Sequence, residues 1–208
     1  MIAQAIQMLS LVCNLGHSVD DSSSSLSVFE LARSWIETCR EKHVACNRRR
    51  DTDCLPTRLI DIGPATFKGS ITSRLIHTSG LEDKGGTKYL ALSHCWGTAS
   101  GGQVPKTTKA SLADRLAGID WDELSKTFHD ALEITRGLCM QYIWIDSLCI
   151  IQDDEADFQI ECAKMGQVYS NAVCTIAVRP LFFCNLSSLS QKFLWVLIVL
   201  SQGVRLSN

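Results

Sequence analysis

The sequence predicts an α/β fold in which helices cover both faces of a mostly parallel sheet, giving three layers. Between residues 89 and 178, short apolar runs of the buried-strand type alternate with segments of helical apolar periodicity. Hydrophobic residues make up 46% of the 208 residues and charged residues 20%, which is typical of a soluble globular chain. The pattern stops after residue 178, so the predicted domain is incomplete at its C-terminal end.

The chain before residue 89 divides into two regions. Residues 1–27 form an N-terminal arm that ends in a serine-rich linker, and residues 28–88 form a helical and β lead-in region. Within the lead-in, apolar residues at steps of three and four predict a helix over Val28–His43. Strand-like runs follow at Arg58–Ile62 and Ser70–Ile76, separated by the Gly63-Pro64 break.

Residues 89–178 carry the predicted α/β core. Apolar runs predict strands at Tyr89–Leu92, Tyr142–Ile145 and Val173–Val178. One amphipathic helix is expected within Leu124–Met140, with Ser125 as its N-cap, and another around Phe158–Tyr169. Because strands and helices alternate, right-handed crossovers and a parallel sheet follow.

Residues 179–208 form an atypical apolar tail. This segment has few charged residues and neither helical nor alternating periodicity. We expect it to reflect a truncated or misread gene; the alternative is an apolar helix that docks on a partner.

Composition and charge exclude several function classes. A formal charge of -2 and a pI near 6.2 exclude nucleic-acid binding through bulk charge, and residues 120–161 are strongly acidic. The longest apolar run, Phe193–Leu200, is too short for a membrane helix. Several of the 10 cysteines occur in apolar segments and there is no clear secretory signal, so we expect reduced thiols and a cytoplasmic protein.

Four segments of the core resemble the fungal heterokaryon-incompatibility (HET) domain. They are Tyr89-Leu-Ala-Leu-Ser-His-Cys-Trp-Gly97, Thr127-Phe-His-Asp-Ala-Leu132, Tyr142-Ile-Trp-Ile-Asp-Ser-Leu-Cys-Ile-Ile-Gln-Asp153 and Lys164-Met-Gly-Gln-Val-Tyr-Ser-Asn-Ala172. With Trp35, Cys39, His43, Cys46 and Leu55–Asp61 upstream, the resemblance spans roughly residues 30–178.

The resemblance implies a signalling or effector domain that takes part in non-self recognition and programmed cell death in fungi. Such a domain would act on protein partners through domain association. The family is also remotely similar to Toll/interleukin-receptor (TIR) domains, which have a flavodoxin-like core and of which some cleave NAD. A TIR-like NAD hydrolase is therefore an alternative, although the chain has no glutamate after Glu161 to serve as the catalytic acid of that family. An inactive gene fragment is the third interpretation.

Polar residues follow two of the predicted strands and form the first candidate site. Ser93, His94, Cys95, Trp96 and Gly97 come after one strand, and Asp146 and Ser147 after the next. Since the carboxyl ends of parallel strands meet at one edge, His94 and Asp146 are candidates for a catalytic base and its orienting carboxylate, and the others for binding. The alternative is that both side chains only hold loop backbone. Cys95 points away from His94 on an extended chain, and Cys149 is expected to pack in the core.

Two further clusters are candidate sites. Gln152 and Asp153 begin an acidic run that continues through Asp154, Glu155 and Asp157. A bound ligand or divalent cation is one interpretation, and charge at the N-terminus of a helix is the simpler one. Four soft ligands, Cys39, His43, Cys46 and Cys54, have the chemistry of a zinc site, but their spacing fits no standard finger and core packing is the alternative.

Overall fold

The computed structural model describes residues 26–42, 55–64, 71–96, 104–178 and 196–199. Its helices are α2 (Leu26–Lys42), α3 (Leu112–Ala117), α4 (Lys126–Gly137), α5 (Asp146–Cys149) and α6 (Glu155–Asn171). Its strands are β1 (Arg58–Asp61), β2 (Arg74–His77), β3 (Tyr89–Ser93), β4 (Tyr142–Ile145), β5 (Thr175–Val178) and β6 (Val196–Val199). Short 3₁₀ turns lie at Thr78–Gly80 and Trp121–Glu123.

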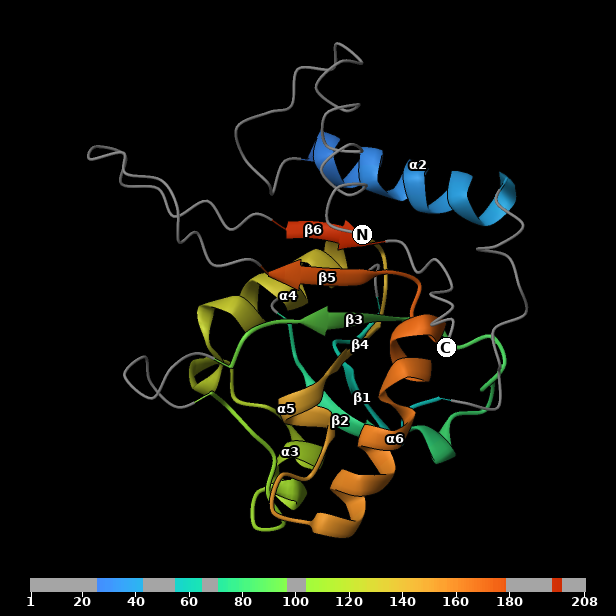
Figure 1. Ribbon diagram of the computed structural model, residues 1–208. Coiled ribbons are helices and arrows are strands. Elements are labelled where there is room, and N and C mark those ends of the chain that lie inside the picture. The colour runs from blue at the N-terminus through green and yellow to red at the C-terminus, as the bar shows by residue number, and fades with distance from the viewer. Residues whose placement is uncertain (1–25, 43–54, 65–70, 97–103, 179–195, 200–208) are drawn as a thin grey trace, which may run out of the picture.

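The strands form one sheet of six strands in the order β2-β1-β4-β3-β5-β6 (Figure 1). As predicted, the three strands of the core are parallel, because β3 pairs in parallel with both β4 and β5. The prediction of a mostly parallel sheet is wrong: β1 pairs antiparallel with β2 and β4, and β6 pairs antiparallel with β5. These outer strands lie outside the strand–helix–strand repeat on which the prediction rested, so the sheet is mixed.

Helices α6 and α4 contact the parallel strands from opposite faces. Successive side chains of a strand alternate between faces. From β3, the Tyr89 hydroxyl donates to the Val168 carbonyl of α6 at 2.6 Å. On the other face, the ring of His94, just beyond β3, lies edge-on to Phe128 of α4 at 5.0 Å. Tyr89 at the start of β3 therefore faces α6, and His94 just beyond its end faces α4.

The core lies where these helices meet the central strands. Its fully buried side chains include Tyr89, Leu90, Leu92, Phe128, Leu132, Ile143, Trp144 and Ile145. Each large apolar side chain buried this completely contributes about 1.5–3 kcal/mol relative to an exposed one. The apolar runs at residues 89–92 and 142–145 were assigned to buried strands, and the burial confirms that assignment.

Helix α4 begins where the sequence predicts. The Ser125 hydroxyl accepts a hydrogen bond from the Phe128 backbone N–H at 3.4 Å and acts as the N-cap. At its other end α4 is crossed closely by α2, since a Cβ at Gly137 would lie 2.6 Å from the ring of Phe29. Arg33 of α2 adds a hydrogen bond to the Gly137 carbonyl at 3.4 Å. Glycine at 137 thus permits the lead-in helix to pack against the core.

Two findings concern the regions that flank the core. β6 lies within the atypical apolar tail, where an apolar helix was the alternative prediction, and it extends the sheet beyond β5 as a strand. The short helices α3 and α5 were not predicted, because four to six residues are too few for a periodic pattern. In the described ranges, none of the helices combines the length and hydropathy that crossing a bilayer requires.

Candidate functional site

The parallel strands bring the predicted edge residues together. Leu92 of β3 is in register with Ile145 of β4, so the residues that follow each strand emerge at the same edge of the sheet. His94 Nδ1 lies 3.8 Å from Asp146 Oδ1, although the two residues are far apart in the sequence. The juxtaposition predicted from strand direction is confirmed.

His94 is a buried imidazole with no polar partner. Only 4% of its side chain is exposed, and neither ring nitrogen has a hydrogen-bond partner among the described residues. Burial lowers the pKa of His94, because it disfavours the charged imidazolium, and the nearby Asp146 carboxylate opposes this in part. The pKa is therefore lowered overall, and the ring is neutral at pH 7.

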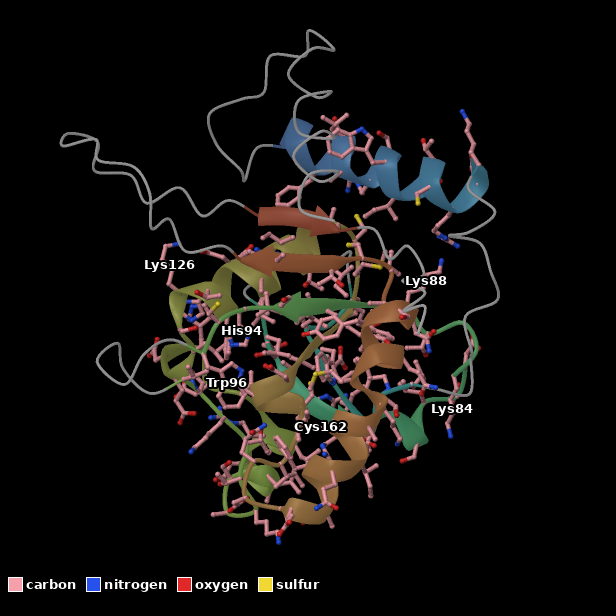
Figure 2. All side chains as sticks on the ribbon, in the orientation of Figure 1. Lys84, Lys88, His94, Trp96, Lys126 and Cys162 are labelled. Carbon is pink, nitrogen blue, oxygen red and sulfur yellow. The ribbon has the colours of Figure 1, made fainter. Side chains whose placement is uncertain are left out.

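Asp146 joins three parts of the site. Its Oδ2 accepts a hydrogen bond from the Trp96 indole Nε1 at 3.0 Å, and its Oδ1 accepts from the Ser147 backbone N–H at 2.6 Å. The second bond satisfies a free donor at the start of α5. Trp96 is 42% exposed, and Figure 2 shows it with His94 at the same end of β3. The carboxylate therefore holds an exposed indole over a buried imidazole.

Two aromatic residues that the sequence did not indicate complete the site. Phe128 of α4 contacts His94, and Tyr169 of α6 donates to the Leu92 carbonyl at 3.3 Å. Burial raises the pKa of Tyr169 to about 12, with a further contribution from the negative charge of Asp146 and a smaller opposing hydrogen bond to Ser93. Both residues lie on predicted helices, but helical periodicity marks them only as core positions.

The remaining edge residues are placed unevenly. Ser93 and Cys95 are exposed, whereas Ser147 is fully buried and its hydroxyl has no partner in the described part of the chain. Gly97 lies outside the described residues. Cys149 is fully buried and its pKa is raised to about 12 by burial, which confirms packing rather than nucleophilic chemistry.

The acidic run has a structural role at the N-terminus of α6. The Asp154 carboxylate is the N-cap and accepts from the backbone N–H groups of Ala156 and Asp157. Asp153 accepts from the Lys109 backbone N–H at 2.7 Å, and the Gln152 amide donates to the Asp146 carbonyl at 3.2 Å. The capping interpretation is confirmed for Asp154. Gln152 and Asp153 line a shallow surface hollow with Glu155 and Phe158.

The proposed zinc ligands cannot be brought together from the described residues. Cys39 is buried on α2, while His43, Cys46 and Cys54 lie outside the described ranges. Within those ranges, no group of three or more histidine, cysteine, aspartate or glutamate side chains has the geometry to hold a metal ion.

Comparison with known proteins finds one family model that matches the part of the chain containing the edge site. Residues 89–180 match the family model of the heterokaryon incompatibility protein (HET). We refer to residues 89–180 as the HET segment. The match confirms the predicted resemblance over residues 89–180, a range that includes every residue of the edge site. No curated protein and no solved structure matches the chain.

The chemistry open to the HET segment follows from this geometry. A neutral imidazole beside a carboxylate is the usual form of an oriented general base. Both ring nitrogens of His94 are shielded, however, and the separation from Asp146 exceeds hydrogen-bond distance. Proton transfer to a ligand would therefore require a rearrangement that exposes a ring nitrogen of His94. Catalytic and binding roles for these residues stay predictions.

Proposed function

We propose that this chain is an effector domain of the heterokaryon-incompatibility type. It takes part in non-self recognition in filamentous fungi and triggers programmed cell death through association with protein partners. The observation that carries the proposal is the family match, because it coincides with the strands and helices that build the edge site.

In this proposal the edge site transmits the signal. Asp146 accepts hydrogen bonds from the exposed Trp96 indole and from the start of α5, and it lies 3.8 Å from the buried ring of His94. A partner that contacts Trp96 would act directly on this carboxylate. A change at the surface would then reach the ends of β3 and β4.

The test is inducible expression of the chain in a filamentous fungus, with cell death followed by a vital dye. We expect the unaltered chain to kill, and Asp146→Asn to reduce the dead fraction at least tenfold by weakening the acceptor for Trp96. Asp130→Asn is the matched control, since it makes the same chemical change on α4, where the carboxylate pairs with exposed Lys126. Protein levels and melting temperatures are compared across all three.

Two outcomes would contradict the proposal. Absence of death with a well-expressed, folded chain would remove the effector role, and full killing by Asp146→Asn would remove the edge site from the mechanism. The purified chain is also incubated with NAD. If nicotinamide is released and Asp146→Asn abolishes that release, the proposed function would change from domain association to nucleotide hydrolysis at His94 and Asp146.

A further inference from the structure

The Asp146 carboxylate lies within reach of two aromatic rings at the carboxyl edge of the sheet. Its Oδ2 accepts from the Trp96 indole at 3.0 Å, and its Oδ1 lies 3.8 Å from Nδ1 of His94. Both rings belong to the segment that follows β3, and Figure 2 labels them at the same end of that strand. The two rings therefore approach different oxygens of one charged group.

The surroundings of His94 suit the neutral ring and oppose the protonated one. Its side chain is 4% exposed, and neither ring nitrogen has a hydrogen-bond partner within the described residues. Phe128 of α4 lies edge-on to the ring at 5.0 Å and offers no acceptor. A protonated imidazole carries two N–H donors and a positive charge. Left in this place, it would be a buried charge without a bonded partner, which is strongly destabilising.

Within the described part of the chain, Asp146 is the charged group that acts on His94. The titratable residues flanking Phe128 on α4, and those on α5 and α6 whose pKa Asp146 affects, are Lys126, His129, Asp130, Cys149, Cys162 and Tyr169. Burial raises the pKa values of the two thiols and the phenol, so these groups stay uncharged at and below pH 7. Lys126 and Asp130 pair with each other at 2.8 Å. An imidazolium at position 94 thus depends on Asp146 for its counter-charge.

We propose that the edge site is a proton-operated switch: when His94 takes up a proton, Asp146 turns to the imidazolium and releases the Trp96 indole to the surface. This inference rests on the proposed function, because it supplies the regulation of the surface residue on which a partner would act. The proton comes from water and bonds to a ring nitrogen, and the carboxylate stays ionised in both states. Because both ring nitrogens are shielded, the proton enters through a transient local opening.

The accessibility of the two rings decides which of them keeps the carboxylate. An imidazolium N–H carries a positive charge, whereas an indole N–H is neutral, so the imidazolium is the stronger donor to Asp146. A bond to His94 requires the 3.8 Å gap to close to about 2.8 Å, which draws Asp146 away from Trp96. Trp96 is 42% exposed, so water can replace the acceptor that it loses. His94 is buried and has no such replacement.

The switch operates on the acid side of neutrality. Burial lowers the pKa of His94 from its usual value of about 6.5, and Asp146 opposes this only in part, so the ring takes up its proton below about pH 6.5. Protonation and binding at Trp96 are linked in both directions. A partner that draws Trp96 away from Asp146 leaves the carboxylate to the imidazolium and raises the proton affinity of His94. Acid in turn strengthens the binding of that partner.

Nuclear magnetic resonance of the full chain tests the proposal by a titration from about pH 7.5 to about pH 5, the range in which histidines usually titrate. The resonances of the Trp96 indole and the His94 ring are assigned by their loss in Trp96→Phe and His94→Gln. We expect the broadening of the Trp96 indole signal by a soluble neutral paramagnetic agent to increase at least twofold. This increase should have the same midpoint as the protonation of His94, and it should be absent in His94→Gln.

His129→Gln is the matched control for this titration. It removes the imidazole that stacks on a different tryptophan, Trp121, with the ring centroids 4.1 Å apart. The Trp96 indole should become accessible at acid pH in His129→Gln as it does in the unaltered chain.

Trp96→Phe tests the linkage from the other side and leaves the buried ring in place. Without the indole donor the carboxylate is free to pair with His94, so the midpoint for protonation of His94 should rise by about 0.5 pH unit or more. Trp35→Phe on α2 is the control, because Trp35 is also 42% exposed, and it should leave that midpoint unchanged. Circular dichroism checks that each variant folds.

Three outcomes would overturn the switch. The Trp96 indole could stay equally shielded while His94 is protonated, the His94 midpoint could be unchanged in Trp96→Phe, or the chain could unfold before His94 takes up a proton. None of these measurements depends on cell death. A chain that kills without this coupling keeps the effector role and loses the switch. Coupling in a chain that does not kill supports the switch and removes the effector role.

Discussion

Asp146 shows how one side chain can organise a site. The residue follows β4 directly, and its two oxygens accept from the Trp96 indole and the Ser147 backbone. Its negative charge also acts on two neighbouring titratable groups, His94 and Tyr169, and raises the pKa of both. It favours the imidazolium of His94 and disfavours the phenolate of Tyr169. For His94 this attraction is smaller than the cost of burial, so the neutral ring persists.

The lowered pKa of His94 makes the stability of the fold depend on pH. In the unfolded chain a histidine titrates near a pKa of about 6.5. As the pH falls below this value, the unfolded state takes up a proton that the folded state does not bind, so the free energy of unfolding decreases. In His94→Gln this contribution is absent. Its free energy of unfolding should fall less steeply between about pH 7 and pH 5 in urea titrations.

The exposed His77 of β2 provides the control for that measurement. His77→Gln should retain the pH dependence of the unaltered chain. Equal slopes for His94→Gln and the unaltered chain would show that His94 does not resist protonation in the folded state.

Polar bonds attach helix α6 to β1 and to Thr57, the residue before it. The guanidinium of Arg58 pairs with Asp157, and its Nε donates to the Cys149 carbonyl at 2.8 Å. Glu161, one turn further along the helix, accepts from the hydroxyl and backbone N–H of Thr57. Next to Glu161, Ile160 is exposed, whereas Val168 on the inner side of the helix is buried in the core. Charge pairs and apolar packing thus hold the helix against the sheet together.

Removing one partner of the buried pair should be costly. Asp157→Asn leaves the guanidinium of Arg58, only 3% exposed, without its counter-charge. We expect a loss of about 3 kcal/mol in the free energy of unfolding, measured by urea denaturation. Lys126→Ala is the control, because it breaks an exposed pair with Asp130 and should cost less than ~0.5 kcal/mol. Similar losses for both variants would mean that Arg58 reaches water in solution.

The sheet as a unit has a central parallel part with antiparallel strands at either side. β3 and β4 are paired along both edges, and their residues are fully buried except at the ends. β2 is an outer strand whose burial alternates, and within the sheet it pairs only with β1. Local opening therefore requires far less disruption at β2 than at the centre.

Amide hydrogen exchange should report this gradient. We expect the amides of Leu90, Ile143 and Trp144 to exchange slowest, close to the rate set by global unfolding. Amides of β2 should exchange at least tenfold faster, measured by NMR or mass spectrometry on the intact chain. Equal protection in β2 and β3 would show that the sheet opens as one cooperative unit.

Local sequence patterns were sufficient for most elements of the core. Apolar runs identified β3, β4 and β5, periodicity identified α2, α4 and α6, and Ser125 marked a helix start, because these signals depend on neighbours within a few residues. The positions of His94 and Asp146 were also predictable, since parallel strands must end at a common edge. These features follow from backbone geometry and from the burial of apolar side chains.

Other features depended on contacts between distant segments. β1, β2 and β6 pair antiparallel with their neighbours in the sheet. A short sequence pattern can predict a strand, but it does not predict the neighbour or the direction of that strand. Phe128 and Tyr169 join the site because α4 and α6 cross the sheet at its carboxyl edge. Ile160 is exposed where the neighbouring Glu161 turns inward and accepts hydrogen bonds from Thr57, just before β1. The strand pairing, the site aromatics and the exposure of Ile160 all depend on packing and charge pairing between residues far apart in the sequence. Those contacts exist only in the folded chain.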